Sequence, residues 1–114
     1  MNSNLTITRS KGFHLTFENG YCISVQFGTG NYCQNKHEDR TFSENFYKER
    51  DCSSADAEIA VWAPGNKGVD GALEELDRYD QVVGWLSADE VGRAISYVQK
   101  GQIKALKRMC RSRK

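Results

Sequence analysis

The stretch Phe13-His-Leu-Thr-Phe-Glu-Asn-Gly-Tyr-Cys-Ile-Ser-Val-Gln-Phe27 decides the fold. Apolar and polar residues alternate on both sides of its central dipeptide, Asn19-Gly20. This period of two is typical of half-buried strands, because successive side chains of a strand point to opposite faces. Asn-Gly readily adopts the positive φ angles of a tight hairpin turn. The stretch therefore predicts a β-hairpin.

The same alternation predicts three further strands. Residues 4–8 precede the hairpin, and residues 57–63 follow it, ending at Pro64-Gly65. Residues 81–86 are expected to form a final short strand. Between these strands, residues 34–54 and 69–78 are polar or rich in glycine and are expected to be loops.

Two helices are expected after the strands. Ser87-Ala-Asp-Glu90 fits a capping box, and Gly101 can end the helix that begins there. A second helix over residues 102–111 places Ile103, Leu106 and Cys110 on one side. The prediction is one α+β domain over residues 1–114, with an antiparallel sheet in residues 1–86 and two α-helices in residues 87–114.

Composition excludes several classes of protein. The chain has 114 residues, 39% hydrophobic and 27% charged, which suits a single globular domain. It contains no apolar run of the roughly 20 residues that a membrane span needs, and its start lacks the layout of a signal peptide. We therefore expect no membrane association and a cytoplasmic location.

The four cysteines are scattered without C-x-x-C spacing and are expected to be free thiols. Cys33 and His37 could supply half of a zinc site, but no second pair of ligands stands at matching spacing. We therefore expect neither a metal nor another cofactor.

Charge is distributed unevenly. Residues 100–114 carry seven basic side chains and no acidic one, which leaves nine basic against fifteen acidic residues in positions 1–99, a balance of −6. A solvated helix face is the simplest interpretation of the basic segment. The functional interpretation is a phosphate site, because arginine binds phosphate through two hydrogen bonds and lysine adds charge. Lys107, Arg108 and Arg111 are its candidate residues, and the nearly neutral chain argues against duplex nucleic acid.

Aromatic residues in loops are candidates for stacking on a nucleotide base, a contact worth about 1–3 kcal/mol. By default these residues are core candidates, together with Phe46, Trp62 and Trp85. Tyr32, Phe42 and Tyr47 are the ones selected for stacking.

No catalytic constellation is apparent. Gly28-Thr-Gly-Asn31 lacks the following helix that a phosphate-cradling loop needs, so a strand-ending turn is favoured. His14 and His37 offer no clear partner for a nucleophilic cysteine. The acidic residues of 38–51 and 70–80 are interpreted as solvated loops. The chain is therefore expected not to be an enzyme.

Three stretches resemble small proteins encoded by tailed bacteriophages, namely residues 18–33, residues 57–62 and residues 84–91. The order of elements, a sheet followed by two helices, resembles the Thoeris anti-defence sponge family. That resemblance implies an oligomer without catalytic activity that sequesters cyclic ADP-ribose signals in the cytoplasm of an infected bacterial host.

The leading hypothesis is accordingly a counter-defence protein that captures a cyclic nucleotide without cleaving it. The alternative is an inhibitor of the anti-CRISPR type, whose acidic loops bind a host effector protein in place of nucleic acid. A hydrolase of nucleotide signals is the third hypothesis. The apolar side of the second helix also predicts a homo-oligomer.

Overall fold

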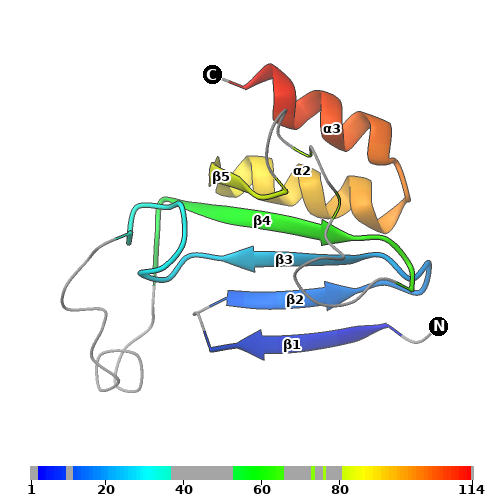
Figure 1. The fold of residues 1–114 in the computed structure, drawn as a ribbon, viewed down its shortest axis with the longest axis horizontal. Helices are drawn as coiled ribbons and strands as arrows, with labels where there is room; N and C mark the ends of the chain where they lie inside the picture. Colours follow the sequence, from blue (N-terminus) through cyan, green and yellow to red (C-terminus); the bar gives the residue numbers. More distant parts are fainter. Residues whose placement is uncertain are drawn as a thin grey trace.

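The computed structural model describes residues 3–9, 12–36, 53–65, 73, 76 and 81–113. Five strands form one antiparallel sheet in the order of the sequence (Figure 1). They are β1 (Asn4–Thr8), β2 (Gly12–Thr16), β3 (Cys22–Gln26), β4 (Asp56–Trp62) and β5 (Val83–Ser87). Because every neighbouring pair is antiparallel, the predicted type of sheet is confirmed.

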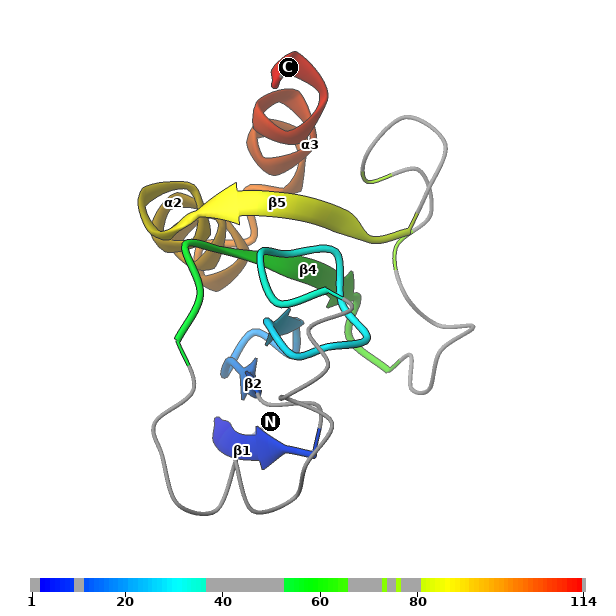
Figure 2. The same cartoon turned by 90° about the vertical axis from the view of Figure 1, so that its left-hand side faces the viewer.

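Two helices follow the sheet, α2 (Ala88–Gln99) and α3 (Ile103–Ser112). Helix α2 packs against β3, β4 and β5, and α3 packs against α2 (Figure 2). The helices thus lie at the β5 end of the sheet, whereas β1 forms the opposite edge. This arrangement confirms the predicted α+β class. Among the described residues, no helix is both long and apolar enough to cross a bilayer.

The core lies between α2 and the central strands. On β3 and β4, Ile23 faces Val61 and Val25 faces Ile59, and all four are at most 2% exposed. Leu86, Ala94 and other buried residues complete this cluster from β5 and the helices. The alternating pattern that predicted the strands therefore identifies their buried face correctly.

The turn of the β2–β3 hairpin contains glycine in the left-handed conformation. Gly20 has φ 91°, and its N–H donates to the carbonyl of Phe17 at 2.8 Å. The Phe17 N–H in turn donates to the carbonyl of Tyr21 at 2.9 Å. This pattern is that of a turn closed by a glycine bulge, in which only the glycine needs positive φ. The hairpin is confirmed, although Asn19 does not share the positive φ.

The side chain of Asn19 connects the hairpin to helix α2. Its Nδ2 donates to the carbonyls of Val98 at 3.1 Å and Gln99 at 2.9 Å. Carbonyls in the last turn of a helix have no partner within the helix. Asn19 therefore supplies these C-terminal hydrogen bonds from a distant part of the sequence.

Both ends of α2 follow the sequence prediction. Ser87 and Glu90 form the predicted capping box, since the Glu90 N–H donates to Ser87 Oγ at 3.2 Å and the Ser87 N–H to Glu90 Oε1 at 2.9 Å. Gly101, with φ 71°, follows the last residues of the helix. Its N–H donates to the Val98 carbonyl, and the Gln102 N–H donates to the Tyr97 carbonyl, as at a helix end terminated by glycine.

Two expectations differ from the structure or fall partly outside it. Strand β5 spans Val83–Ser87, so it starts and ends later than residues 81–86. Most of the predicted loops at 34–54 and 69–78 lie outside the described residues. Within the second loop, Leu76 is fully buried, and the Leu73 N–H donates to the Val61 carbonyl at 2.6 Å.

Candidate phosphate-binding site

Helix α3 carries four basic residues along one stripe. Lys104, Lys107, Arg108 and Arg111 recur at three- and four-residue spacing, which places them on one face of a helix. Leu106 on the other side is fully buried, because that side packs on the core. The amphipathic pattern predicted from the sequence is therefore confirmed.

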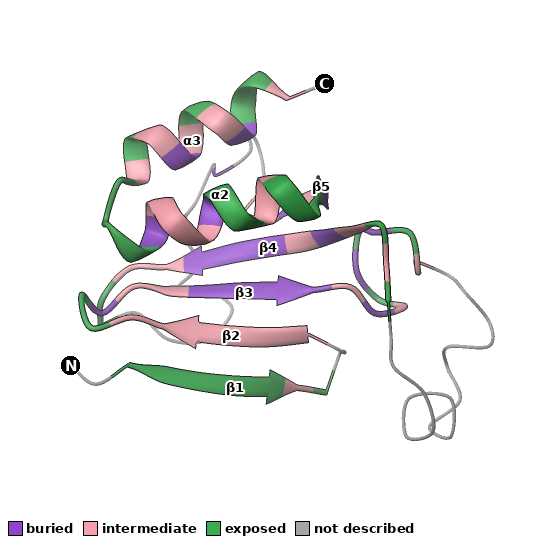
Figure 3. Ribbon diagram, turned by 180° about the vertical axis from the view of Figure 1, so that it is seen from behind, coloured by how far each residue is buried: buried purple, intermediate pink, exposed green. Residues whose placement is uncertain are grey.

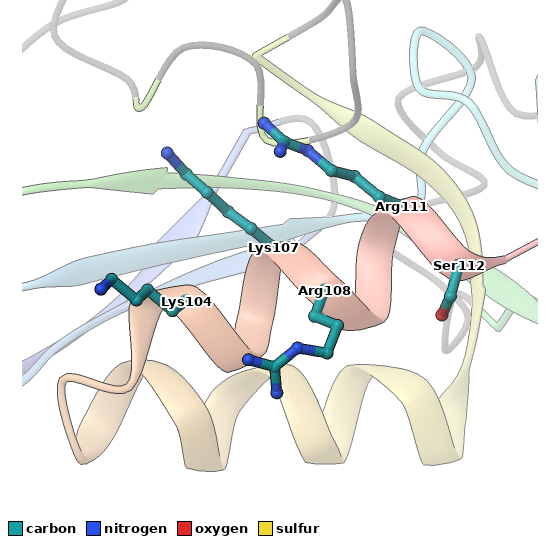
Figure 4. Close-up of a pocket in the computed structure, with 5 residues that line it drawn as sticks. All are labelled: Lys104, Lys107, Arg108, Arg111 and Ser112. Atoms are coloured by element: carbon teal, nitrogen blue, oxygen red, sulfur yellow. The ribbon is translucent and has the colours of Figure 1, made fainter.

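These side chains surround a shallow, open hollow of about 480 Å³ (Figure 4). Its lining consists of Lys104, Lys107, Arg108, Arg111 and Ser112. The structure thus brings together the three basic residues selected from the sequence and adds Lys104 and Ser112. We call the four basic residues Lys104, Lys107, Arg108 and Arg111 the α3 stripe.

Three of the four basic residues of the α3 stripe meet no carboxylate among the described residues. Lys104, Lys107 and Arg108 make no ion pair or side-chain hydrogen bond within the described part of the chain. Like charges at these helical spacings destabilise a helix by a few tenths of a kcal/mol per pair. A bound anion would remove this repulsion, so the stripe favours a negatively charged ligand.

The basic groups spread apart at their tips. In Figure 4, the tips of Lys107 and Arg111 point away from the tip of Arg108. Such an arrangement offers separate contacts along the helix rather than one closed cage. It suits a ligand with more than one phosphate or a phosphate attached to a larger group.

A second open hollow, of about 560 Å³, adjoins the first and shares Lys104 and Arg108 with it. Its lining also includes Tyr21, at the start of the hairpin's second strand, and Gly101 and Gln102, between the helices. Tyr21 is half-buried. Tyr21 therefore lines a hollow together with two of the basic residues, and an aromatic residue next to basic ones suits a base linked to phosphate.

Tyr21 is not among the residues predicted from the sequence. Its alternation with Ile23 and Val25 marks it only as a strand residue. The hairpin turn before it is joined to the end of α2 by the Asn19 side chain, and Tyr21 itself packs against the core. A contact between residues so distant in the chain leaves no signal in local patterning.

Tyr32, selected from the sequence, lies at a different place. Its carbonyl accepts from the Trp85 N–H at 2.9 Å, and the Lys36 ammonium lies 4.6 Å from the centre of its ring. Tyr32 is 43% exposed but lines neither hollow. The other selected aromatics, Phe42 and Tyr47, lie outside the described residues, so their roles stay predictions.

The expectation that Trp85 lies in the core is wrong. Trp85 is 51% exposed and has φ 62°, an unusual conformation for a residue with a side chain. The reason is a bulge in β5: Ala57 pairs with Leu86 but Ile59 pairs with Val83, so two residues of β5 face Glu58 alone. The bulge turns Trp85 out of the alternating pattern.

Trp62 is half-buried and contacts the ring of His14, with 5.7 Å between centroids.

Among the described residues, His14 does not form a catalytic pair with Cys22 or Cys33. No hydrogen bond joins His14 to a cysteine among the described residues, and burial lowers the pKa of His14. Cys22 and Cys33 are free thiols, as predicted. Burial is the main factor that raises the pKa of the Cys33 thiol, whose Sγ lies 3.4 Å from the Gly28 carbonyl. A high pKa disfavours the reactive thiolate.

The glycine-containing segment after β3 forms a turn, as predicted. The Asn31 N–H donates to the Gly28 carbonyl at 3.3 Å, and the Gly28 N–H donates to Asn31 Oδ1 at 2.9 Å. Asn31 Nδ2 then donates to Glu58 Oε1 at 3.1 Å, which fixes the turn on β4. Its polar groups are thus used within the protein rather than directed at an anion.

Metal-ligating residues do not gather in groups of three or more in the parts of the chain that the structure describes. His37, the second residue of the candidate zinc pair, lies outside those parts, as do the acidic residues of 38–51 and most of 70–80.

Comparisons with known proteins add no further assignment: the chain matches no family model, no curated protein and no solved structure.

Proposed function

We propose that this protein binds a small phosphorylated nucleotide along the α3 stripe and holds it without cleaving it. The observation that carries the proposal is the hollow lined by four basic side chains, three of which meet no carboxylate in the described structure. Tyr21 beside Lys104 and Arg108 supports a ligand that has a base as well as phosphate.

A cyclic nucleotide of the cyclic ADP-ribose type is the first ligand to test. It combines two phosphates with an adenine, and the sequence resemblance to phage sponge proteins implies it. In this proposal Arg108, Arg111, Lys104 and Lys107 contact phosphate, and Tyr21 contacts the base. The protein would then act in an infected bacterial cell by lowering the concentration of an immune signal.

The test is capture followed by release. Purified protein is incubated with cyclic ADP-ribose isomers and removed by filtration, and the ligand left in the filtrate is measured by chromatography. The retained protein is then denatured by heat, and the compound that it releases is analysed in the same way. Loss of the ligand followed by recovery of the intact compound supports sequestration. A new product would show an enzyme, and a ligand that stays in the filtrate would reject this ligand.

The double variant Arg108→Ala/Arg111→Ala locates the site. Losing charge-assisted hydrogen bonds to phosphate, each worth about 1.5–3 kcal/mol, should weaken binding by more than about tenfold. The matched control is Arg93→Ala/Lys100→Ala, which removes the same charge from exposed positions outside α3. Equal losses in both variants would indicate an effect of net charge alone, and unchanged affinity in the first variant would reject the α3 stripe.

A further inference from the structure

Edge strand β1 exposes two aliphatic side chains on the face of the sheet that forms the core. Leu5 is 77% exposed and Ile7 is 89% exposed. The register continues two buried rows of the sheet into β1: one row is Leu5, Leu15, Ile23 and Val61, and the other is Ile7, Phe13, Val25 and Ile59. Figure 3 shows the change along these rows, from buried β3 and β4 through intermediate β2 to exposed β1. The apolar face therefore extends beyond the part that the helices cover.

The backbone groups of the same two residues point away from the sheet. Phe17 and Tyr21 continue the pairing of β2 with β3. The Phe17 N–H donates to the Tyr21 carbonyl, so they form a hydrogen-bonded pair. Hydrogen-bonded and non-hydrogen-bonded pairs alternate along antiparallel strands, so residues 12, 14 and 16 of β2 direct their backbone groups toward β1. Their partners in β1 are residues 8, 6 and 4. The N–H and C=O groups of Leu5 and Ile7 therefore lie on the edge of the sheet where no further described strand pairs with β1.

This edge lacks the usual features that prevent pairing. The sequence of β1, Asn-Leu-Thr-Ile-Thr, contains no charged residue and no proline, and its register with β2 is continuous. Edge strands that remain unpaired are commonly protected by lysine, proline or a bulge. The pattern of β1 is also symmetric about Thr6, with an aliphatic residue on each side.

We propose that β1 pairs with β1 of a second copy of this chain, antiparallel and across a two-fold axis at Thr6. In this register Leu5 faces Ile7 of the second copy, and the outward backbone groups of both residues find partners. An identical partner brings no like charges opposite each other within residues 3–9, because Arg9 then faces the uncharged Ser3. The pairing joins two sheets into one and places the exposed aliphatic residues of both copies together on the same face.

This interface is independent of the proposed nucleotide site. The α3 stripe belongs to the helices at the β5 end of the sheet, whereas β1 is the other edge strand. It also differs from the oligomer predicted through the second helix. Either proposal can therefore fail without the other.

The decisive experiment is a cross-link specific to this register. Thr6 lies opposite Thr6 of the second copy in a non-hydrogen-bonded pair, where Cα atoms are about 4.5 Å apart. Two cysteines at that distance can form a disulfide. Mild oxidation of Thr6→Cys should therefore give a covalent dimer on a non-reducing gel. The wild-type protein should show twice the chain mass of 12.9 kDa by light scattering.

Asn4→Cys is the matched control, because it adds a cysteine to the same face of the same strand. The two copies of residue 4 would be about 13 Å apart in this register, since a strand rises about 3.3 Å per residue. Disulfides do not span more than about 7 Å between Cα atoms. This control also accounts for cross-links through the native cysteines, so it should remain largely uncross-linked.

Ile7→Lys supplies a test without cysteine chemistry. Its side chain is exposed, so the variant should fold with an unchanged circular dichroism spectrum, but the dimer should dissociate to a single chain. A wild-type protein that is a monomer at all concentrations would overturn the proposal. So would a dimer in which Thr6→Cys cross-links no better than Asn4→Cys.

Discussion

The guanidinium of Arg113 donates from Nε to Oε2 of Glu90 at 2.8 Å. Its other two nitrogens donate to the carbonyls of Gly84, at 3.2 Å, and Trp85. Oε1 of Glu90 meanwhile accepts from the Ser87 N–H, within the capping box of α2. One arginine after the end of α3 therefore holds both the bulge of β5 and the start of α2.

Replacing Arg113 should destabilise the fold. The two side chains of the ion pair are only 17% and 22% exposed, and Arg113→Ala would leave two carbonyls without this donor. Hydrogen bonds to charged groups contribute about 1.5–3 kcal/mol, so we expect a loss of about that size in the free energy of unfolding. Arg113→Lys should recover only part of it, because an ammonium cannot reproduce the planar fork. Chemical denaturation near neutral pH measures these differences.

Arg93→Ala is the control for this prediction. Arg93 is an exposed basic residue of α2 that makes no ion pair or hydrogen bond within the described residues, and such surface changes usually alter stability by less than about 0.5 kcal/mol. If Arg113→Ala and Arg93→Ala had the same effect, the hydrogen bonds of Arg113 would contribute nothing to stability.

Stability should depend on pH through Glu90. Burial acts to raise the pKa of its carboxyl, but hydrogen bonds from Ser87 and Arg113 and the charge of Arg113 lower it below the ordinary value of 4.5. A carboxyl whose pKa is lower in the folded state adds stability above its unfolded pKa and loses it as pH falls through the folded one. The stability difference between wild type and Glu90→Gln should be constant near neutral pH and shrink as pH falls below 4.5.

Denaturation midpoints measured over a series of pH values test this expectation. Glu90→Gln keeps the side-chain shape and a hydrogen-bond acceptor but has no charge to lose. A stability difference that stays the same from neutral to acidic pH would show that the ionisation of Glu90 is not linked to folding.

The strands and helices were predictable because their signals are local. The Asn19-Gly20 turn, the capping box that starts at Ser87 and the glycine at position 101 each act within a few residues. All three occur in the structure, although in the turn only Gly20 has positive φ. The basic stripe was predictable for the same reason, since helical spacing alone places Lys107, Arg108 and Arg111 on one face.

Features that depend on contacts between distant segments were missed. Tyr21 lines a hollow with residues of α3, more than 80 positions later in the chain, and Asn19 beside it binds the end of α2. Trp85 leaves the core because β5 has an extra residue opposite Glu58, which alternation of apolar residues does not reveal. The exposure of Leu5 and Ile7 likewise follows from the place of β1 at the edge, because their alternation predicts a buried face.

The backbone of Trp85 provides a third prediction. A residue with a side chain pays about 1–2 kcal/mol for the left-handed conformation, and glycine does not. Trp85→Gly and Trp85→Ala both remove the indole, but only alanine keeps the penalty at φ 62°. We therefore expect the glycine variant to have the higher free energy of unfolding, by about 1 kcal/mol.

The control pair is Arg93→Gly and Arg93→Ala in α2, where the order should reverse. Glycine inside a helix costs about 1 kcal/mol relative to alanine. Denaturation of the four variants under the same conditions gives both comparisons. If alanine were the better residue at both positions, the left-handed conformation of Trp85 would not be a source of strain.

The link between Asn19 and α2 provides the last prediction. Asn19 donates two hydrogen bonds to carbonyls at the helix C-terminus, where the helix dipole is negative. Asn19→Ala should lower the free energy of unfolding by about 1–2 kcal/mol, because each net hydrogen bond contributes about 0.5–1.5 kcal/mol. Asn19→Asp should be worse than alanine near neutral pH, since the carboxylate cannot donate and its charge faces the negative end of the helix. Aspartate still offers an acceptor for the Tyr21 N–H, the contact that Asn19 Oδ1 makes at 3.0 Å. An aspartate variant as stable as wild type would therefore show that the turn contact matters and the contact with α2 does not.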